Sequence, residues 1–280
     1  MNIVVCMKPV PDPRKWGKLK LDPRTMLLRR GEVPAVINPL DRNAIEQAIA
    51  LRSAAGGPSP RSGPSRATSA DGIVTVISMA PKDAEEQLAE SLAMGCDRAY
   101  LLSDPAFAGA DSLATARCLA AAIRRLGAVD LVFCGGYSLD GSTSQVGPQV
   151  AELLDMPDLT HVTALSVDGS TLRARCAVED GEAVYDCELP ALVTFDKDVN
   201  VPRLPSMTGI MRSGAVGVTC WTAADLALRP DEIGLSGSPT QMLNIFAPSL
   251  GRKGDMLEGS PSQMAAALVD KLKATRRHAS

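Results

Sequence analysis

The chain has 280 residues, of which 45% are hydrophobic and 3% aromatic, and its 29 basic and 32 acidic side chains give a net charge of −3. This length suits one large domain or two modest ones, and the apolar content is sufficient for a buried core. The balanced charge and the few aromatic side chains argue against nucleic acid as a partner, because nucleic-acid-binding proteins present basic surfaces and aromatic platforms.

The first residues, MNIVVCMKPVP, hold a five-residue apolar run before Lys8 and no basic leader. This run is too short for a secretion signal or a membrane span. We therefore expect a soluble, cytoplasmic protein that is not embedded in a membrane.

The cysteine and histidine content argues against a metal site. The seven cysteines form no C-x-x-C pair, and the only histidines are His161 and His278. Ordinary zinc and iron sites need more ligands of these types. We expect reduced, structural cysteines and no bound metal.

Short apolar runs alternate with helical patterns in the first half of the chain. The runs cover residues 2–7, 73–78, 98–102 and 131–134, and are typical of strands buried on both faces of a parallel sheet. Helical periodicity covers residues 38–52, 82–94 and 111–126. Asn38 and Pro39 suit the start of the first helix, and Gly95 and Gly127 suit the ends of the others. The alternation predicts an α/β fold with a doubly wound, mainly parallel, Rossmann-like sheet covered by helices on both faces.

The pattern changes beyond residue 160. Apolar alternation over 162–167, 171–177 and 182–189 is interrupted by Asp-Gly pairs, which are hairpin signals. These runs predict an antiparallel extension that returns to the sheet through residues 191–195.

The remaining segment, 197–280, is rich in proline and glycine until an amphipathic stretch near 261–273. It has too few core residues to fold alone. We therefore predict an α/β domain over 1–196 and a C-terminal arm over 197–280. Within the first domain, residues 53–70 are rich in proline, glycine and serine and predict a flexible insertion.

A glycine-rich segment, LVFCGGYSLDGSTSQVGPQVAELL, follows the predicted strand at 131–134. Its glycines allow close backbone approach, and Ser142, Thr143 and Ser144 add hydroxyl donors just before a helix. Such a loop favours a phosphate at a helix start. The spacing is neither G-x-G-x-x-G nor G-x-x-x-x-G-K-[ST], so a plain strand-to-helix turn explains it equally well. We expect Gly141 to adopt a positive φ.

A hydrolase is the less favoured interpretation of the same segment. The stretch from Gly136 to Asp140 approaches G-x-S-x-G, but Asp140 stands where the last glycine is needed. The available base is His161, and a lone histidine near a helix-to-strand junction is more often structural. We therefore expect no catalytic residues.

Several segments together resemble the beta subunit of electron transfer flavoprotein. They include MNIVVCMKPVPD, VINPLDRNAIEQAIALR, the glycine-rich segment, VPRLPSMTGIMRS and WTAADLALRPDEIGLSGSPTQMLNIFAPS. The resemblance covers nearly the whole chain in order. It implies an adenine-nucleotide-binding domain and a C-terminal arm that embraces an alpha subunit. It also implies electron transfer between flavin-dependent dehydrogenases or reductases and an acceptor, with FAD held mainly by the alpha subunit.

The resemblance also implies the site residues. Met207 falls on the position that docks dehydrogenase partners, while Lys8 either faces the pocket or is solvated. The nucleotide-contacting positions fall on Cys6, Asn38, Pro39, Leu40, Asp41, Met79, Gly135, Gly136, Tyr137, Ser138, Leu139, Asp140, Gly141, Ser142, Thr143, Ser144, Gln145 and Val146.

This chain departs from the family pattern at two positions in the glycine-rich segment. Gly136 stands where the family usually has a basic residue, and Ser142 where it often has an acid. These departures leave open which nucleotide is bound.

The tail GSPTQMLNIFAP and the exit QVGP resemble the electron-bifurcating and nitrogen-fixation-associated branches of the family. That branch implies FAD rather than AMP in the beta pocket, with NADH as a further reactant if the protein bifurcates electrons. The alternative is a stand-alone adenine-nucleotide-binding regulatory protein built on the same α/β domain.

Overall fold

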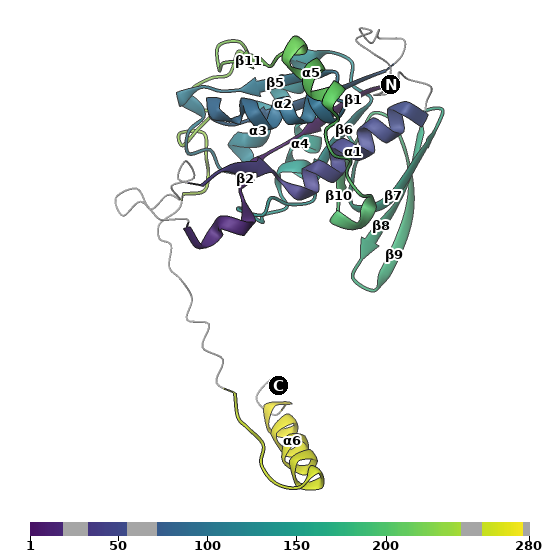
Figure 1. The fold of residues 1–280 in the computed structure, drawn as a ribbon, viewed down its shortest axis with the longest axis vertical. Coiled ribbons are helices and arrows are strands. Elements are labelled where there is room, and N and C mark those ends of the chain that lie inside the picture. The colour runs from purple at the N-terminus through teal and green to yellow at the C-terminus, as the bar shows by residue number, and fades with distance from the viewer. Residues whose placement is uncertain (19–32, 55–71, 242–253, 277–280) are drawn as a thin grey trace. The chain divides into compact units, whose positions relative to one another are not determined.

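The computed structural model describes residues 1–18, 33–54, 72–241 and 254–276 (Figure 1). The chain forms two compact units, Met1–Met242 and Leu243–Ser280. The second unit contains one described helix, α6 (Pro261–Arg276). Most of the predicted insertion, from residue 55 to 70, lies outside the described residues. No helix in the described ranges is long and apolar enough to cross a membrane.

A nine-stranded sheet organises the first unit, in the order β11-β5-β4-β1-β6-β10-β7-β8-β9. From β11 to β7 all neighbours are parallel. These parallel strands are β1 (Asn2–Cys6), β4 (Ile73–Met79), β5 (Arg98–Leu102), β6 (Leu131–Gly135), β10 (Ala191–Phe195) and β11 (Thr219–Trp221). The apolar runs predicted β1, β4, β5 and β6, whereas β11 lies in the segment assigned to the C-terminal arm and was not predicted.

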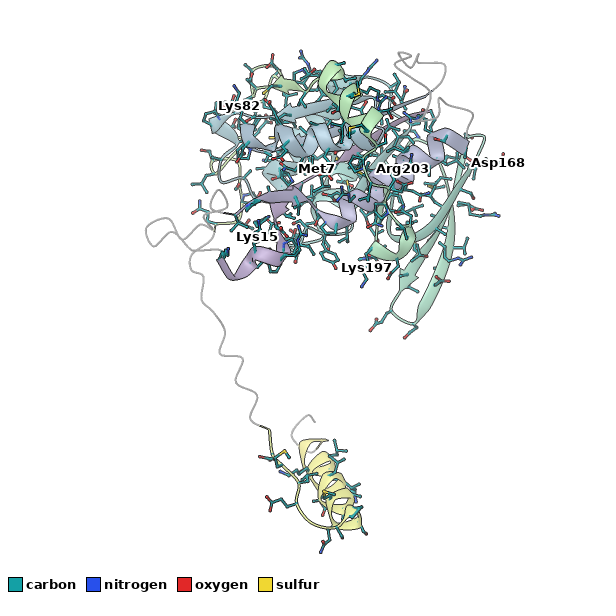
Figure 2. All side chains as sticks on the ribbon, in the orientation of Figure 1. Met7, Lys15, Lys82, Asp168, Lys197 and Arg203 are labelled. Atoms are coloured by element: carbon teal, nitrogen blue, oxygen red, sulfur yellow. The ribbon has the colours of Figure 1, made fainter. Side chains whose placement is uncertain are left out.

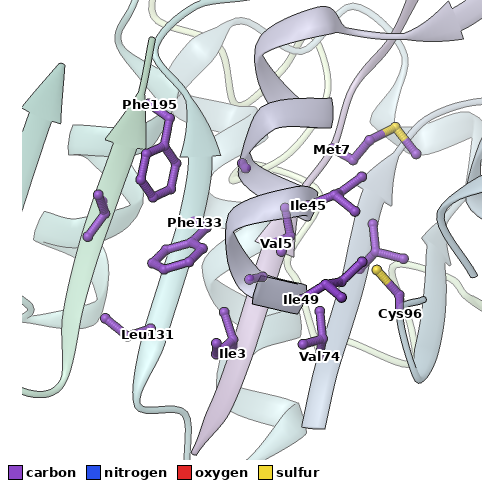
Figure 3. Close-up of a cluster of buried hydrophobic side chains, with 14 of the residues drawn as sticks. Ile3, Val5, Met7, Ile45, Ile49, Val74, Cys96, Leu131, Phe133 and Phe195 are labelled. Atoms are coloured by element: carbon purple, nitrogen blue, oxygen red, sulfur yellow. The ribbon is translucent and has the colours of Figure 1, made fainter. Parts of the chain in front are cut away.

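Helices cover both faces of this sheet, which confirms the doubly wound prediction. Helices α1 (Pro39–Ala54) and α2 (Glu85–Met94) contribute to one buried core, and α3 (Ser112–Leu126) and α4 (Val146–Leu154) contribute to the other. Figure 3 shows the first core, where Ile45 and Ile49 of α1 lie over Ile3 and Val5 of β1. Such apolar burial is the main force that holds helices on a sheet.

Local capping chemistry accounts for the start of α3 and the end of α2. Asp111 caps α3, because its carboxylate accepts the Ala114 N–H at 3.0 Å. Gly95 ends α2 at a φ of 136°. The second helix begins later than predicted, because a 3-10 turn, η3 (Lys82–Ala84), precedes α2. Another 3-10 turn, η4 (Pro105–Phe107), lies between β5 and α3.

The antiparallel extension is confirmed. It consists of β7 (Asp158–Asp168), β8 (Thr171–Val178) and β9 (Gly181–Glu188), and β7 also pairs in parallel with β10. Gly169 lies in the first turn at a φ of 59°.

Sequence analysis missed a second, two-stranded sheet of β2 (Pro9–Pro11) and β3 (Ala35–Ile37). Its strands are short and one is bounded by prolines, so no periodic signal marks them. The 3-10 turn η1 (Pro13–Lys18) follows β2.

Residues 197–241 lie within the first unit. They include the 3-10 turn η5 (Lys197–Val199) and helix α5 (Met207–Val216). Arg203, labelled in Figure 2, donates two hydrogen bonds of 2.7 Å to Glu46 of α1. Arg212 of α5 donates to the Leu92 and Cys96 carbonyls at the end of α2. The predicted boundary between residues 196 and 197 stays a prediction.

Gly209 sets how closely α5 approaches α2. A Cβ at this position would lie 2.1 Å from the Ala93 carbonyl oxygen, whereas a Cβ at Gly214 on the same helix meets nothing within 4 Å. Because the obstacle at Gly209 is backbone, the helix itself must shift to accept a side chain.

We predict that Gly209→Ala lowers the free energy of unfolding by about 1–3 kcal/mol through overpacking. The matched control Gly214→Ala should be neutral or stabilise by up to about 1 kcal/mol, because alanine favours helix. Denaturant unfolding of the purified variants measures both. Equal stabilities for the two variants would contradict a close α2–α5 contact.

Candidate functional site

The sequence-predicted site residues gather at the carboxyl ends of the central strands. Cys6, Met79 and Gly135 lie at the ends of β1, β4 and β6, which are neighbours in the sheet. Successive crossovers from β1 lead to β4 and β5 on one side, and the chain then returns to β6 on the other. The crevice at such a switch point is where doubly wound sheets bind ligands.

Asp41 joins the first turn of α1 to two strand ends. Its Oδ2 accepts the Lys8 N–H at 2.8 Å, and its Oδ1 accepts the Gly135 N–H at 3.0 Å. Asp41 is 6% exposed. Burial raises the pKa of Asp41 to about 6, although the N–H donors of Lys8 and Gly135 favour the charged form.

Gly135 is required at this contact for space. A Cβ at this position would lie 2.4 Å from Asp41 Oδ1 and 2.7 Å from Leu40 Cβ. Leu40 and Asp41, which the resemblance placed in the nucleotide site, therefore lie directly against the start of the glycine-rich loop.

Asn38 holds the same loop through two side-chain hydrogen bonds. Its Nδ2 donates to the Tyr137 carbonyl at 2.9 Å, and its Oδ1 accepts the Leu139 N–H at 3.2 Å. The Asn38 N–H donates to the Lys8 carbonyl at 3.0 Å, and its side chain is fully buried. The Asn38 side chain thus supplies the loop backbone with hydrogen bonds that a neighbouring strand would otherwise make. The sequence signal for a helix start does not by itself reveal this role.

Lys8 faces the loop. Its Nζ lies 2.6 Å from Asp140 Oδ1 and donates to Ser138 Oγ at 3.2 Å. The Asp140 side chain is 3% exposed and that of Lys8 is 40% exposed. Lys8 therefore contacts the loop and is also partly exposed, and its role in a pocket stays a prediction.

The tip of the loop, residues 141–145, is exposed. Ser142 and Ser144 adopt positive φ values of 52° and 54°, whereas Gly141 does not, so the expected positive φ at Gly141 is wrong. A Cβ at Gly141 would instead lie 3.1 Å from Ser138 Oγ. The Ser142 N–H donates to the Ser138 carbonyl at 2.8 Å and closes the turn over residues 138–142.

Helix α4 starts without a side-chain cap. Among the described residues, none accepts a hydrogen bond from the N–H groups of Thr143, Ser144 or Gln145. The Gln145 side chain accepts instead from Ser112 Oγ at 2.9 Å. The loop therefore presents free donors at the positive end of a helix dipole, which suits an anion.

The cysteines and histidine near the site show no nucleophilic arrangement. A hydrogen bond with Cys6, followed by burial, raises the pKa of Cys134 well above its ordinary value. A protonated thiol is a poor nucleophile. His161 bonds to Asp196 rather than to Ser138. The described residues contain no group of three or more side chains suited to a metal.

Met207, the predicted docking residue, lies at the first position of α5 and is 74% exposed. Leu204 and Met211 beside it are also exposed. Leu204 lines a hollow of about 400 Å³ between α2, α5 and the Arg203–Glu46 pair. An apolar surface of this kind is available to a partner.

The raised pKa of Asp41 predicts that the free energy of unfolding depends on pH. Its folded-state pKa lies above the ordinary 3.8, so its contribution to stability is present below pH 4 and is lost as the pH rises through 6. Asp41→Asn removes this dependence. We expect the unfolding free energy of the variant, relative to wild type, to rise by roughly 2–3 kcal/mol between pH 4 and pH 7.

Chemical denaturation at both pH values measures this change. The control is Asp83→Asn, which removes an exposed carboxylate and should show no comparable change. If the difference in unfolding free energy between wild type and Asp41→Asn is the same at pH 4 and pH 7, the raised pKa of the buried Asp41 is contradicted.

Comparison with known proteins agrees with this geometry. Residues 62–226 match the electron transfer flavoprotein domain. Electron transfer flavoprotein subunit beta of Thermoanaerobacterium thermosaccharolyticum is 43% identical over 273 residues, which cover 97% of this chain and 98% of the relative. The caffeyl-CoA reductase-Etf complex subunit CarD of Acetobacterium woodii is 40% identical, with 98% of each covered. Protein FixA of Azorhizobium caulinodans is 38% identical, with 96% and 92% covered.

Similarity of this extent shows both the family and its general function, which is electron transfer. The described α/β fold is the one that the resemblance implied. The chain belongs to the electron transfer flavoprotein family.

Proposed function

We propose that this chain is the beta-type subunit of a two-subunit flavoprotein and that it holds the adenosine diphosphate part of an FAD on the loop at 135–146. The observation that supports this most directly is the set of free N–H donors at Thr143, Ser144 and Gln145, which precede the uncapped start of α4. A pyrophosphate uses several donors at a helix start, whereas AMP offers a single phosphate.

The residues present fit such a group. The space in front of Gly135 is already filled by Leu40 and Asp41, so the ligand lies farther along the loop. Ser142 and Thr143 are exposed there, and neither adds a negative charge. Lys8 contributes one cation, which it shares with Asp140. The phosphates therefore rest mainly on backbone donors rather than on a cluster of charges.

The chain's own residues hold and orient the cofactor, and they make and break no covalent bonds. When bound, FAD supplies the capacity to accept and release electrons. Asn38 and Asp41 keep the loop in place by fixing the backbone at Tyr137, Leu139 and Gly135. A rigid cradle of this kind positions the redox group without reorganisation.

The same proposal includes two protein partners of the chain. The alpha subunit binds the C-terminal arm, and a flavin-dependent dehydrogenase or reductase docks at Met207. The relative from Acetobacterium woodii is named as a subunit of a reductase-Etf complex. The exposed side chains of Leu204, Met207 and Met211 support a docking surface on α5, and methionine adapts to partners of different shape.

We place the chain in the bifurcating and nitrogen-fixation-associated branch, with NADH as an additional reactant at the beta pocket. The similarity to FixA supports this placement. Residues 242–248 of the tail that suggested the branch lie outside the described residues. A stand-alone regulatory protein, the alternative, requires a chain that binds adenine nucleotides without an alpha subunit.

The cofactor content of the purified complex tests the proposal. We expect two FAD and no AMP per heterodimer, because the loop offers a pyrophosphate cradle. Acid extraction followed by chromatography and absorbance measures both. One FAD with one AMP would contradict the FAD assignment, and a stable chain that binds nucleotide without an alpha subunit would favour the regulatory alternative.

Substitution of Gly141 tests the loop separately. Gly141→Val should reduce bound nucleotide severalfold while the fold survives, because its side chain crowds Ser138 Oγ and Lys8 Nζ, which lie 3.1 and 3.6 Å from the Cβ position. The matched control is Gly17→Val, where no atom lies within 4 Å of the Cβ position. Normal nucleotide content in folded Gly141→Val would favour the interpretation of the loop as a plain strand-to-helix turn.

A further inference from the structure

The start of helix α3 holds the last part of the first unit. Asp111 caps α3 through its Oδ1, and its Oδ2 accepts the Thr240 N–H at 3.0 Å and the Thr240 hydroxyl at 2.7 Å. The Asp111 N–H donates to Ser238 Oγ at 2.8 Å. Both oxygens of one carboxylate and the N–H of the same residue are therefore used to join residues 238–240 to the helix.

The segment just before Thr240 lies close against the same part of the domain. A Cβ at Gly234 would lie 2.1 Å from the Ala106 carbonyl oxygen, so the two backbones are in direct contact. Arg117 of α3 donates to the Gly237 carbonyl at 3.2 Å. The chain is thus fixed in position shortly before Leu243, where the second unit begins.

Ser112, the first residue of α3, contacts the glycine-rich loop. Its Oγ donates to Gln145 Oε1 at 2.9 Å. Gln145 directly precedes α4, and its N–H has no acceptor among the described residues. At the other end of the two helices, Arg124 of α3 donates to the Leu153 carbonyl of α4. Helices α3 and α4 are bonded at both ends, so the start of α4 follows the position of the start of α3.

We infer that Asp111 and Ser112 are positioning residues of the nucleotide loop and that residues 238–240 support the loop through them; the inference rests on the proposed function. A loop that is already held in place loses less conformational freedom when a ligand binds. The hydrogen bonds at Asp111 and Ser112 therefore strengthen phosphate binding, although neither side chain touches the phosphate.

The same contacts couple the nucleotide to the C-terminal arm. In the proposed function the alpha subunit binds the chain that follows Thr240. Coupling between two binding events is reciprocal. An alpha subunit that keeps Thr240 on Asp111 strengthens nucleotide binding, and a nucleotide on the loop strengthens the contact between Asp111 and Thr240.

The experiment uses the complex with its alpha subunit after removal of nucleotide, titrated calorimetrically with ADP-ribose. Any binding by the alpha subunit is common to all variants, so a difference between them belongs to this chain. Thr240→Val and Ser112→Ala should each weaken binding roughly threefold to tenfold, the range expected for loss of one hydrogen bond. The double variant should be no weaker than the weaker single variant, because both residues act along one path.

Two further variants separate the hydrogen bond from a general loss of structure. Thr240→Ser keeps the hydroxyl group and should bind ADP-ribose as wild type does. The matched control is Thr222→Val. The Thr222 hydroxyl donates to Asp225 Oδ2 at 2.7 Å, a bond that involves neither Asp111 nor the glycine-rich loop. This control should also bind as wild type does.

Hydrogen–deuterium exchange of the same complex tests the reciprocal effect. The Thr240 N–H donates to Asp111, so its exchange reports on this contact. ADP-ribose should slow its exchange severalfold in wild type and leave it unchanged in Ser112→Ala, where the path to the loop is broken.

Several results would contradict the inference and leave the proposed function standing. They are wild-type affinity in Ser112→Ala and Thr240→Val, losses that add in the double variant, Thr240→Ser that binds as weakly as Thr240→Val, and Thr240 exchange that does not respond to ADP-ribose. Wild type that fails to bind ADP-ribose overturns the proposed function together with the inference.

Discussion

The site depends on one buried carboxylate. Asp41 receives the N–H groups of Lys8 and Gly135 and thereby ties the first turn of α1 to the ends of β1 and β6. Two hydrogen bonds to a charged acceptor offset much of the cost of burial, but the pKa near 6 shows that the balance is close. Together with the hydrogen bonds from Asn38 to Tyr137 and Leu139, this contact fixes the loop relative to the first helix.

The loop is arranged so that backbone N–H groups, rather than charged side chains, are available in front of α4. The Asn38 side chain accepts a hydrogen bond from the Leu139 N–H and donates one to the Tyr137 carbonyl, and these two bonds fix the position of the loop. The N–H groups before α4 stay free and exposed. Fixed dipoles of this kind bind phosphate without the electrostatic field that a group of lysines would create. The near-neutral net charge of the chain is consistent with such a site.

The exposed apolar surface of α5 depends on a different set of contacts. Gly209 lets α5 lie directly on the end of α2, and Arg212 secures it through two carbonyls. The opposite side of the same short helix leaves Met207 and Met211 exposed. Helix α5 is held by contacts with α2 and the glycine-rich loop by contacts with α1. Arg203, which precedes α5, also pairs with Glu46 of α1.

The sequence alone determined the class of fold and the position of the loop. Apolar runs and helical periodicity are local patterns, and they predicted the parallel strands, the covering helices and the β7–β9 extension. The resemblance predicted the family, and the comparisons confirm it. The pairing of Asp41 with Gly135, however, joins residues 94 positions apart in the chain, and no local pattern encodes such a contact.

The tertiary structure decided the finer features of the site. Positive φ falls on Ser142 and Ser144 rather than on Gly141, although glycine adopts it more readily. The shifted register of β7 places His161 beside Asp196 and Gly136, a contact that the sequence did not indicate. Backbone conformation and long-range contacts depend on how strands and helices pack around a residue, and composition and spacing carry no record of that packing.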